Sequence, residues 1–241
     1  MRTTITRYIK NNRVLFFMIK PIIHLNRYIF REYFRNKKFL KNGEFVLLEA
    51  KRALESANVL FWLDFGTLLG VYRDGAFLTN DLDIDLGIFL DDYSVEIENV
   101  MKKHGFKLIK EYHIDNKKYG LEQTYILKGV TIDLFYYTVK NDIMYSHLFH
   151  HFPKLTYAES IEIKGGLLPI EQYLPISSFD KISFLNHNFT VPIPTDKYLS
   201  YHYGDEYKTS KPWSYYDLEN DNKNAKFLYN KIGVVSQFKN K

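Results

Sequence analysis

Residues 65–89 read FGTLLGVYRDGAFLTNDLDIDLGIF, and the run DLDIDL near their end decides how this part of the chain folds. Asp81, Asp83 and Asp85 alternate with apolar residues, so in an extended strand the three carboxylates point to one face and the apolar side chains to the other. Two carboxylates about 4 Å apart repel by roughly 4 kcal/mol at an effective dielectric constant near 20. We therefore expect a strand with one buried face, and a cation or a proton at the acidic face.

A further acid interrupts a later apolar strand. Within VTIDLFYY, residues 130–137, Asp133 falls on the face opposite its apolar neighbours. Two aspartates on one strand and a third on a neighbouring strand can hold one or two Mg²⁺ ions, which take oxygen ligands and bridge substrate phosphates. We predict Asp83, Asp85 and Asp133 as metal-binding and catalytic residues, with Mg²⁺ or Mn²⁺ as the cofactor.

A small turn upstream has the groups that suit a phosphate. Gly66 permits a sharp turn after the strand-like run VLFWLD, residues 59–64. The backbone N–H groups and the Thr67 hydroxyl at the start of the next helix can bind an anion, and Arg73 is close enough in sequence to add a bidentate contact. Because phosphoryl transfer needs mainly charge neutralisation and alignment, this set predicts an enzyme that handles phosphate groups.

The hydrophobic patterns around this stretch predict an α+β fold, in which a mixed β-sheet is backed by helices. The expected helices are 44–56, 67–72 and about 93–104, with a short helical end near 225–232. The expected strands are 59–64, 81–89, 106–112, 119–127 and 130–139.

The composition is that of a globular protein with an uneven charge. The 241 residues are 46% hydrophobic, and the absence of cysteine excludes disulfides and thiolate metal sites. Residues 1–42 hold eleven Lys and Arg against Glu32 alone, a net charge of +10, which leaves −5 for the rest. A uniformly basic nucleic-acid-binding protein would not show this split, so we expect no nucleic acid partner. We divide the chain into a basic arm, 1–42, and a catalytic domain, 43–241.

The basic arm is amphipathic but has too few apolar residues to cross a membrane. VLFFMIKPIIHL, residues 14–25, falls short of the ~20 apolar residues of a spanning helix, and Lys20 interrupts the apolar run that a signal peptide needs. From Pro21, large apolar and basic residues recur at helical spacing on opposite sides. Two interpretations stay open: a helix lying on an anionic membrane surface through residues 13–38, and a helix packed on the domain with a solvated basic face.

Two motifs together resemble a known family. Gly-Thr, a gap, Asp-apolar-Asp and a later apolar-Asp-apolar form the pattern of the DNA polymerase beta-like nucleotidyltransferase fold, and GTLLGVYRDGAFLTNDLDIDLGIF resembles its LicD and fukutin-like branch. FLNHNFTVPIPTDKYLSYHYGDEYKTSKPW, residues 184–213, is similar to the same branch. The resemblance, over about 57–213, implies transfer of a phosphorylated alcohol, such as phosphocholine or ribitol phosphate, from a CDP-activated donor to a sugar hydroxyl, with release of CMP.

The resemblance also implies roles for single residues. Asp83 and Asp85 match the family's metal-binding acids, and Asp133 matches its third acid, as a base or as a metal ligand. The turn with Gly66 and Thr67, together with Arg73, matches the donor-phosphate turn.

Three further residues are candidates for a nucleotide pocket. These are Tyr203 and Gly204, for which the alternative is a helix end packed by tyrosines, and Trp213, for which the alternative is a buried aromatic side chain. The histidines of SHLFHH, residues 146–151, have a spacing that matches no closed zinc site.

The family resemblance and the basic arm predict a phosphotransferase that decorates a lipopolysaccharide, capsule or glycolipid. Its acceptor would be a saccharide or a lipid-linked saccharide, and its location cytoplasmic, at the inner face of the membrane. Two alternatives stay open: transfer of a whole nucleotide from an NTP to a protein, RNA or small molecule, and a membrane-associated scaffold without activity. Release of CMP or of pyrophosphate distinguishes the two reactions.

Overall fold

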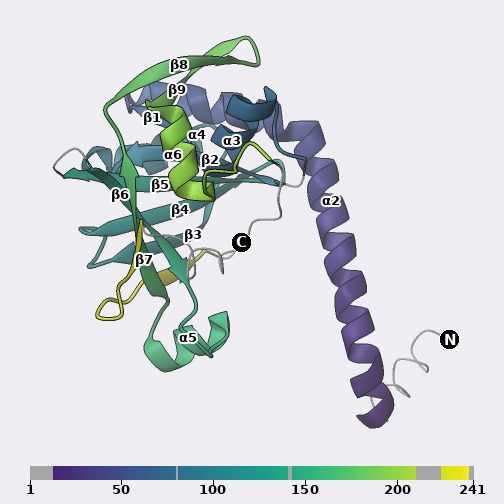
Figure 1. Cartoon of the computed structure of the whole chain (residues 1–241). Coiled ribbons are helices and arrows are strands. Elements are labelled where there is room, and N and C mark those ends of the chain that lie inside the picture. Colours follow the sequence, from purple (N-terminus) through teal and green to yellow (C-terminus); the bar gives the residue numbers. More distant parts are fainter. Residues whose placement is uncertain (1–12, 80, 141–142, 210–223, 239–241) are drawn as a thin grey trace.

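The computed structural model describes residues 13–79, 81–140, 143–209 and 224–238, with only the backbone described for 13–31. They form an α+β body from which one long helix projects (Figure 1). The helices are α2 (Arg13–Ser56), α3 (Phe65–Asp74), the 3-10 turn η1 (Leu90–Asp92), α4 (Val95–Lys103), α5 (Tyr157–Lys164) and α6 (Thr195–Tyr203). The strands are β1 (Phe61–Leu63), β2 (Asp83–Phe89), β3 (Lys107–Ile114), β4 (Gly120–Leu127), β5 (Val130–Lys140), β6 (Ile143–His150), β7 (Leu168–Pro175), β8 (Ser178–Phe184), β9 (His187–Ile193), β10 (Ala225–Phe227) and β11 (Val234–Gln237).

A nine-stranded sheet organises the described residues, and it confirms the predicted mixed sheet backed by helices. Its main path runs β10-β7-β6-β5-β4-β3-β11, with antiparallel neighbours. β2 lies off this path, since it pairs parallel with β5 and antiparallel with β1. The parallel register sets Asp83 opposite Thr131 and Asp85 opposite Asp133, so acids from two strands meet where both strands begin.

The core lies between this sheet and the C-terminal half of α2, which contacts β2, β5 and α4. Leu47, Ala50 and Leu54 recur on one helical face and are fully buried, as are Ile84 of β2 and Leu134 of β5. Because successive strand residues point to opposite faces, burial of these even-numbered residues leaves the odd-numbered acids for the other face of the sheet.

The helix α6 lies over that other face (Figure 1). The hydroxyl oxygen of Tyr198 of α6 lies 3.3 Å from that of Tyr137, an odd-numbered residue of β5. Phe65, the first residue of α3, packs its ring between Phe135 of β5 and His202 of α6, with both centroid separations at 4.4 Å. The acids therefore share their face of the sheet with α3 and α6.

The short strand β1 is secured by Trp62, which is fully buried. Its indole lies over its register partner Gly87, where a Cβ would come within 2.1 Å of the ring. The rings of Phe89, Tyr137 and Phe179 surround it with centroids 5.0–5.2 Å away. Since Phe179 belongs to β8, this cluster also holds the β8–β9 hairpin against the body.

The helix α2 is longer than the pattern predicts. It runs from Arg13 to Ser56 with no break at residue 42, and Pro21 lies inside it. Phe39 is buried, and Gly43 packs against its ring, so the helix joins the core before the predicted end of the arm. The division of the chain into an arm, 1–42, and a domain, 43–241, stays a prediction. The boundary lies inside α2 and not at the end of a helix or strand.

The predicted helical end at 225–232 is wrong. Ala225–Phe227 is β10, antiparallel to β7, and Val234–Gln237 is β11, antiparallel to β3. The chain returns to the sheet at β7 and β3, where edge strands offer unpaired N–H and C=O groups. The spacing of apolar residues within a segment does not report pairing with a distant strand, so the sequence pattern could not predict β10 and β11.

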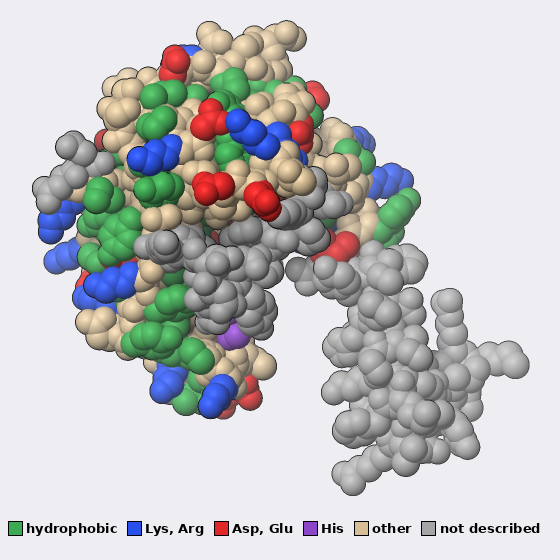
Figure 2. All heavy atoms as spheres, viewed as in Figure 1, with side chains coloured by type: hydrophobic (Ala, Val, Ile, Leu, Met, Phe, Trp, Pro, Cys, Tyr) green, Lys and Arg blue, Asp and Glu red, His purple; other side chains and the backbone are tan. Residues whose placement is uncertain are grey.

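The described surface combines apolar and charged areas. On the face drawn in Figure 2, hydrophobic side chains gather over β6, β7 and α5, with Lys and Arg side chains scattered among them. Ile143, Tyr157 and Ile163 are among the exposed apolar side chains of this region. Within the residues that the structure describes, no helix has the length and apolar content needed to span a membrane.

The contact between Trp62 and Gly87 predicts a stability effect. Gly87→Ala should lower the free energy of unfolding by about 1–3 kcal/mol, because the new Cβ overlaps the indole. Gly43→Ala is the matched control: its Cβ meets the Phe39 ring at an ordinary 3.4 Å, and alanine favours a helix over glycine by up to about 1 kcal/mol. Denaturant unfolding measures both variants, and a Gly87→Ala protein as stable as wild type would contradict the packing described.

Candidate active site

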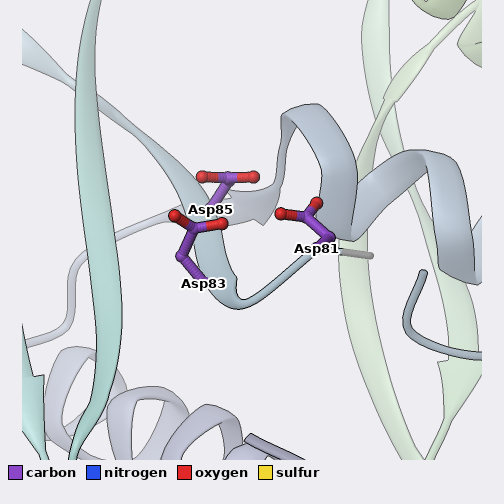
Figure 3. A group of neighbouring side chains, drawn as sticks. All are labelled: Asp81, Asp83 and Asp85. Carbon is purple, nitrogen blue, oxygen red and sulfur yellow. The ribbon is translucent and has the colours of Figure 1, made fainter. Parts of the chain in front are cut away.

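Three aspartates converge at the start of β2. Asp81 lies in the loop before the strand, Asp83 is its first residue, and Asp85 follows two residues later. Their carboxylates face one another in Figure 3, and one oxygen of each lies within 4.8 Å of the others. Among the described residues, this is the one group of three or more acidic, histidine or cysteine side chains close enough to hold a metal ion.

The first turn of α3 is bonded to this group. The Gly66 N–H donates to Asp85 Oδ2 at 3.1 Å, and the Asp85 N–H donates to Thr67 Oγ1 at 2.9 Å. A Cβ at residue 66 would lie 1.7 Å from Asp81 Oδ2, so only glycine leaves room for that carboxylate. The structure thus brings the predicted Gly66 and Thr67 to the predicted acids.

A buried carboxylate holds the other side of this turn. Asp64 caps α3 by accepting a hydrogen bond from the Phe65 N–H, and it accepts two more from the hydroxyls of Tyr137, at 2.5 Å, and Tyr198, at 2.8 Å. Burial raises the pKa of Asp64 to about 6, against the effect of these donors. Through this one residue the strand β5 and the helix α6 set the position of the turn.

Asp133 lies beside the group of three rather than within it. It is the register partner of Asp85, and its Oδ1 accepts a hydrogen bond from the hydroxyl of Thr124 on β4. Burial, followed by the charge of Asp83, raises the pKa of Asp133 to about 6, while Lys110 and Arg35 act in the opposite direction.

Glu122 adds an acid that the sequence motifs did not single out. It lies two residues before Thr124 on β4, on the same strand face, and is partly buried. Burial and the charge of Asp133 raise its pKa to about 8. The alternation within GLEQTYIL places Glu122 on one face, but only the pairing of β4 with β5 brings that face to Asp133.

The electrostatics of the group favour a bound cation. Burial, then a hydrogen bond with Asp83, raises the pKa of Asp81 to about 8. Burial, then the charges of Asp83, Asp81 and Asp133, raises the pKa of Asp85 well above its usual value. Carboxylate oxygens are ligands that hard divalent cations prefer. The cluster of oxygens therefore fits a divalent cation held by Asp81, Asp83 and Asp85.

One basic side chain forms an ion pair with these aspartates in the described part of the chain. Arg35 Nη2 lies 3.8 Å from Asp83 Oδ2, and Arg35 Nη1 lies 3.2 Å from Glu32 Oε1. Each side chain of the Arg35–Asp83 pair is about one-third exposed, so the pair lies at the solvent edge of the site.

Arg73 is placed at the other end of α3. Its guanidinium pairs with Asp74 at 2.7 Å and donates to the Tyr207 carbonyl at 3.2 Å. Residues 66 and 73 are about 10 Å apart along a helix of 1.5 Å rise. The observed contacts join α3 to the segment after α6, and the predicted phosphate contact of Arg73 stays a prediction.

The remaining predicted pocket residues lie at the end of α6 or later in the sequence. Tyr203 is the last residue of α6, and Gly204, at φ 80°, ends the helix by donating to the Ser200 carbonyl. Trp213 lies outside the described residues. The histidines of SHLFHH form no metal group in the described residues, and His147 lies beside Glu171, with 3.4 Å between Nε2 and Oε2.

Comparison with known proteins identifies the domain. Residues 58–173 match the family model described as LicD/FKTN/FKRP, nucleotidyltransferase domain. This part of the chain, just under half of its length, is similar to the LicD and fukutin-like family. The matched residues include all the acids of the site and the first turn of α3, and end before α6.

Several curated relatives of this LicD-like chain are distant in sequence. The human ribitol-5-phosphate transferase FKTN is 26% identical over 179 residues, which are 73% of this chain and 36% of FKTN. The Caenorhabditis elegans protein T07A5.1 is 26% identical over 213 residues, 84% of this chain and 52% of that protein. The human ribitol 5-phosphate transferase FKRP is 40% identical over 60 residues, 22% of this chain and 12% of FKRP. The chain thus spans at most about half the length of these relatives.

The raised pKa values predict a stability that depends on pH. Asp81, Asp85 and Glu122 bind more protons in the folded than in the unfolded protein, so their contribution is complete below about pH 4 and is lost as the pH rises toward about 8. His202, whose pKa burial lowers to about 3, has the opposite slope, but only below its unfolded pKa near 6.5. Metal-free protein should therefore lose unfolding free energy between pH 6.5 and 8.0.

Addition of Mg²⁺ should remove the loss of unfolding free energy between pH 6.5 and 8.0, because a cation at the aspartates favours their charged forms. Urea unfolding at both pH values, in EDTA or in Mg²⁺, measures the difference. Asp81→Asn is the control. It removes one of the groups with a raised pKa, so the loss of unfolding free energy in EDTA should be smaller. A metal-free protein equally stable at pH 6.5 and 8.0 would contradict the electrostatics described.

Proposed function

We propose that this domain transfers a phosphorylated alcohol, such as ribitol phosphate or phosphocholine, from a CDP-activated donor to a sugar hydroxyl and releases CMP. The observation that carries the proposal is the convergence of Asp81, Asp83 and Asp85 on the first turn of α3. Relatives named as ribitol-5-phosphate transferases, in a family that includes residues 58–173, support this reaction type. On this proposal the chain is an enzyme of the phosphotransferase class.

The three aspartates would hold Mg²⁺ or Mn²⁺. When bound, such an ion neutralises phosphate charge and aligns the phosphorus for attack. Asp81, Asp83 and Asp85 offer the oxygen ligands for it, and the hydrogen bonds from Gly66 and to Thr67 keep Asp85 in place. The N-terminal end of the α3 dipole faces the same space and favours the negative charge of a donor diphosphate.

Asp133 is suited to accept the proton of the attacking sugar hydroxyl. Its carboxylate belongs to the neighbouring strand and is oriented by Thr124, while the group of three forms without it. As the hydroxyl oxygen forms its bond to the phosphorus, the bond between that phosphorus and the CMP oxygen breaks, and the hydroxyl proton moves to Asp133. A base whose pKa is about 6 is mostly ionised at neutral pH, as this role requires.

A membrane location is part of the same proposal. The helix α2 extends away from the body toward its N-terminal end (Figure 1). Residues 13–38 of this helix carry seven Lys and Arg against one acid, and anionic lipid attracts each basic residue near its surface by about 1 kcal/mol. We place this segment at an anionic membrane surface, on the cytoplasmic side, where a lipid-linked saccharide would be the acceptor.

The reaction predicts metal-dependent release of CMP. With a panel of CDP-alcohols and a cell-envelope extract as acceptor, the wild-type protein should release CMP from one donor in Mg²⁺ and none in EDTA. Asp83→Asn and Asp85→Asn should each lower the rate at least 100-fold, because each removes a charged ligand. Chromatography of the nucleotide products measures the effect.

Asp91→Asn is the matched control for these variants. Asp91 is exposed and follows the far end of β2, about 20 Å along the strand from Asp83, so the same loss of charge should leave the rate unchanged. Pyrophosphate released from an NTP, with no CMP from any donor, would instead favour transfer of a whole nucleotide. Absence of both products and of nucleotide binding would favour a scaffold.

The proposed base predicts a change in the pH profile. Wild-type kcat should fall on the acid side, at about pH 6 or below, because protonated Asp133 cannot accept a proton and a bound cation lowers its pKa further. Asp133→Asn should lower kcat about 100-fold or more, with little change in KM for the donor, and should flatten this acid limb. An Asp133→Asn enzyme with the wild-type pH profile would exclude Asp133 as the base.

A further inference from the structure

We propose that Arg35, on α2, is a phosphate-binding residue of this site and contacts the diphosphate of the donor when a metal ion occupies the aspartates. The inference rests on the proposed function and adds a substrate-binding residue from outside the matched region 58–173. On this proposal α2, the helix that extends from the body, contributes a residue to the donor site.

The guanidinium of Arg35 lies beside the aspartates, at the solvent edge of the site. It is 3.8 Å from the Asp83 carboxylate, although 48 residues separate Arg35 and Asp83 in sequence. Both side chains are about one-third exposed, so a ligand from solvent can reach them. The guanidinium therefore lies at the entrance to the three aspartates and not in the core.

Contacts of α2 one to two turns further along hold the backbone of Arg35 in place. One turn further along α2, Phe39 is buried and packs edge to face on Phe77, with centroids 5.1 Å apart. Asn42 Nδ2 donates to the Lys128 carbonyl at 3.1 Å, which ties the helix to the turn between β4 and β5. β5, which carries Asp133, begins directly after this turn. Arg35 is thus presented to the acids by an anchored helix.

The side chain of Arg35 is of a type that suits a phosphate ligand. A guanidinium has a planar fork of donors that matches two phosphate oxygens at once. The 3.8 Å separation from Asp83 is longer than a hydrogen bond, so the ion pair is loose. Once a divalent cation satisfies Asp83, the attraction between Asp83 and Arg35 is reduced, and the nearest new anion is the donor diphosphate.

A purely structural role predicts a different result. If Arg35 only compensated the charge of Asp83, its removal would change metal binding and leave nucleotide binding in saturating metal unaffected. If Arg35 binds phosphate, its removal lowers the affinity for the diphosphate and does not lower the affinity for the metal. The two roles are therefore separated by titrating metal and nucleotide independently.

The experiment is calorimetric titration of the full chain with Mn²⁺ alone, and with CDP or CMP in saturating Mn²⁺. Arg35→Gln should weaken CDP binding about tenfold, equal to about 1.4 kcal/mol, and CMP binding less, since CMP lacks the second phosphate. Mn²⁺ affinity should stay the same or rise, because the competing guanidinium is gone. Arg35→Lys keeps the charge without the fork and should recover part of the CDP affinity.

Arg52→Gln is the matched control. Arg52 lies on the same helix, about 25 Å further along its axis, is 57% exposed and pairs with Glu49. It should bind Mn²⁺, CDP and CMP as wild type does. An Arg35→Gln protein that binds CDP like the Arg52→Gln control would overturn the role of Arg35 while leaving the proposed function in place. A wild-type protein that binds neither CDP nor CMP in Mn²⁺ would overturn the proposed function, and the role of Arg35 with it.

Discussion

The mutual repulsion of the carboxylates of Asp81, Asp83 and Asp85 is the constraint on which the site depends. Burial, together with the charges of the neighbouring aspartates, raises the pKa of Asp81 and of Asp85, since the fold holds these groups where their charged forms are disfavoured. The apolar face of β2, buried in the core, keeps the strand in position against this repulsion. A divalent cation would convert the same repulsion into binding free energy, because the positions that bring the carboxylates into conflict also give the ion its oxygen ligands.

The buried Asp64 connects this cluster to the rest of the fold. It joins the end of β1 to the start of α3 and accepts hydrogen bonds from Tyr137 of β5 and Tyr198 of α6. The first turn of α3 is thereby held between Asp64 on one side and Asp85 on the other. On the outer side, Arg35 of α2 approaches the same acids. The site is thus assembled from segments that are distant in sequence and that meet around one helix N-terminus.

Local sequence patterns were enough for part of this arrangement. The alternation of the aspartates with apolar residues predicted β2 and its acidic face, and the glycine before Thr67 predicted the turn into α3. The positions of Glu122 and Arg35 depend on which strands and helices become neighbours, which local periodicity does not report. The chain after residue 224 was misassigned for the same reason, because β10 and β11 exist only through pairing with distant strands.

The most direct test of the account is to locate a bound cation. Crystals of the protein grown with Mn²⁺ and CDP, measured for anomalous scattering from manganese, would show where the ion lies. The account predicts an anomalous peak held by carboxylate oxygens of Asp81, Asp83 and Asp85, next to the first turn of α3. A peak held by other residues, or no peak in saturating Mn²⁺, would contradict it.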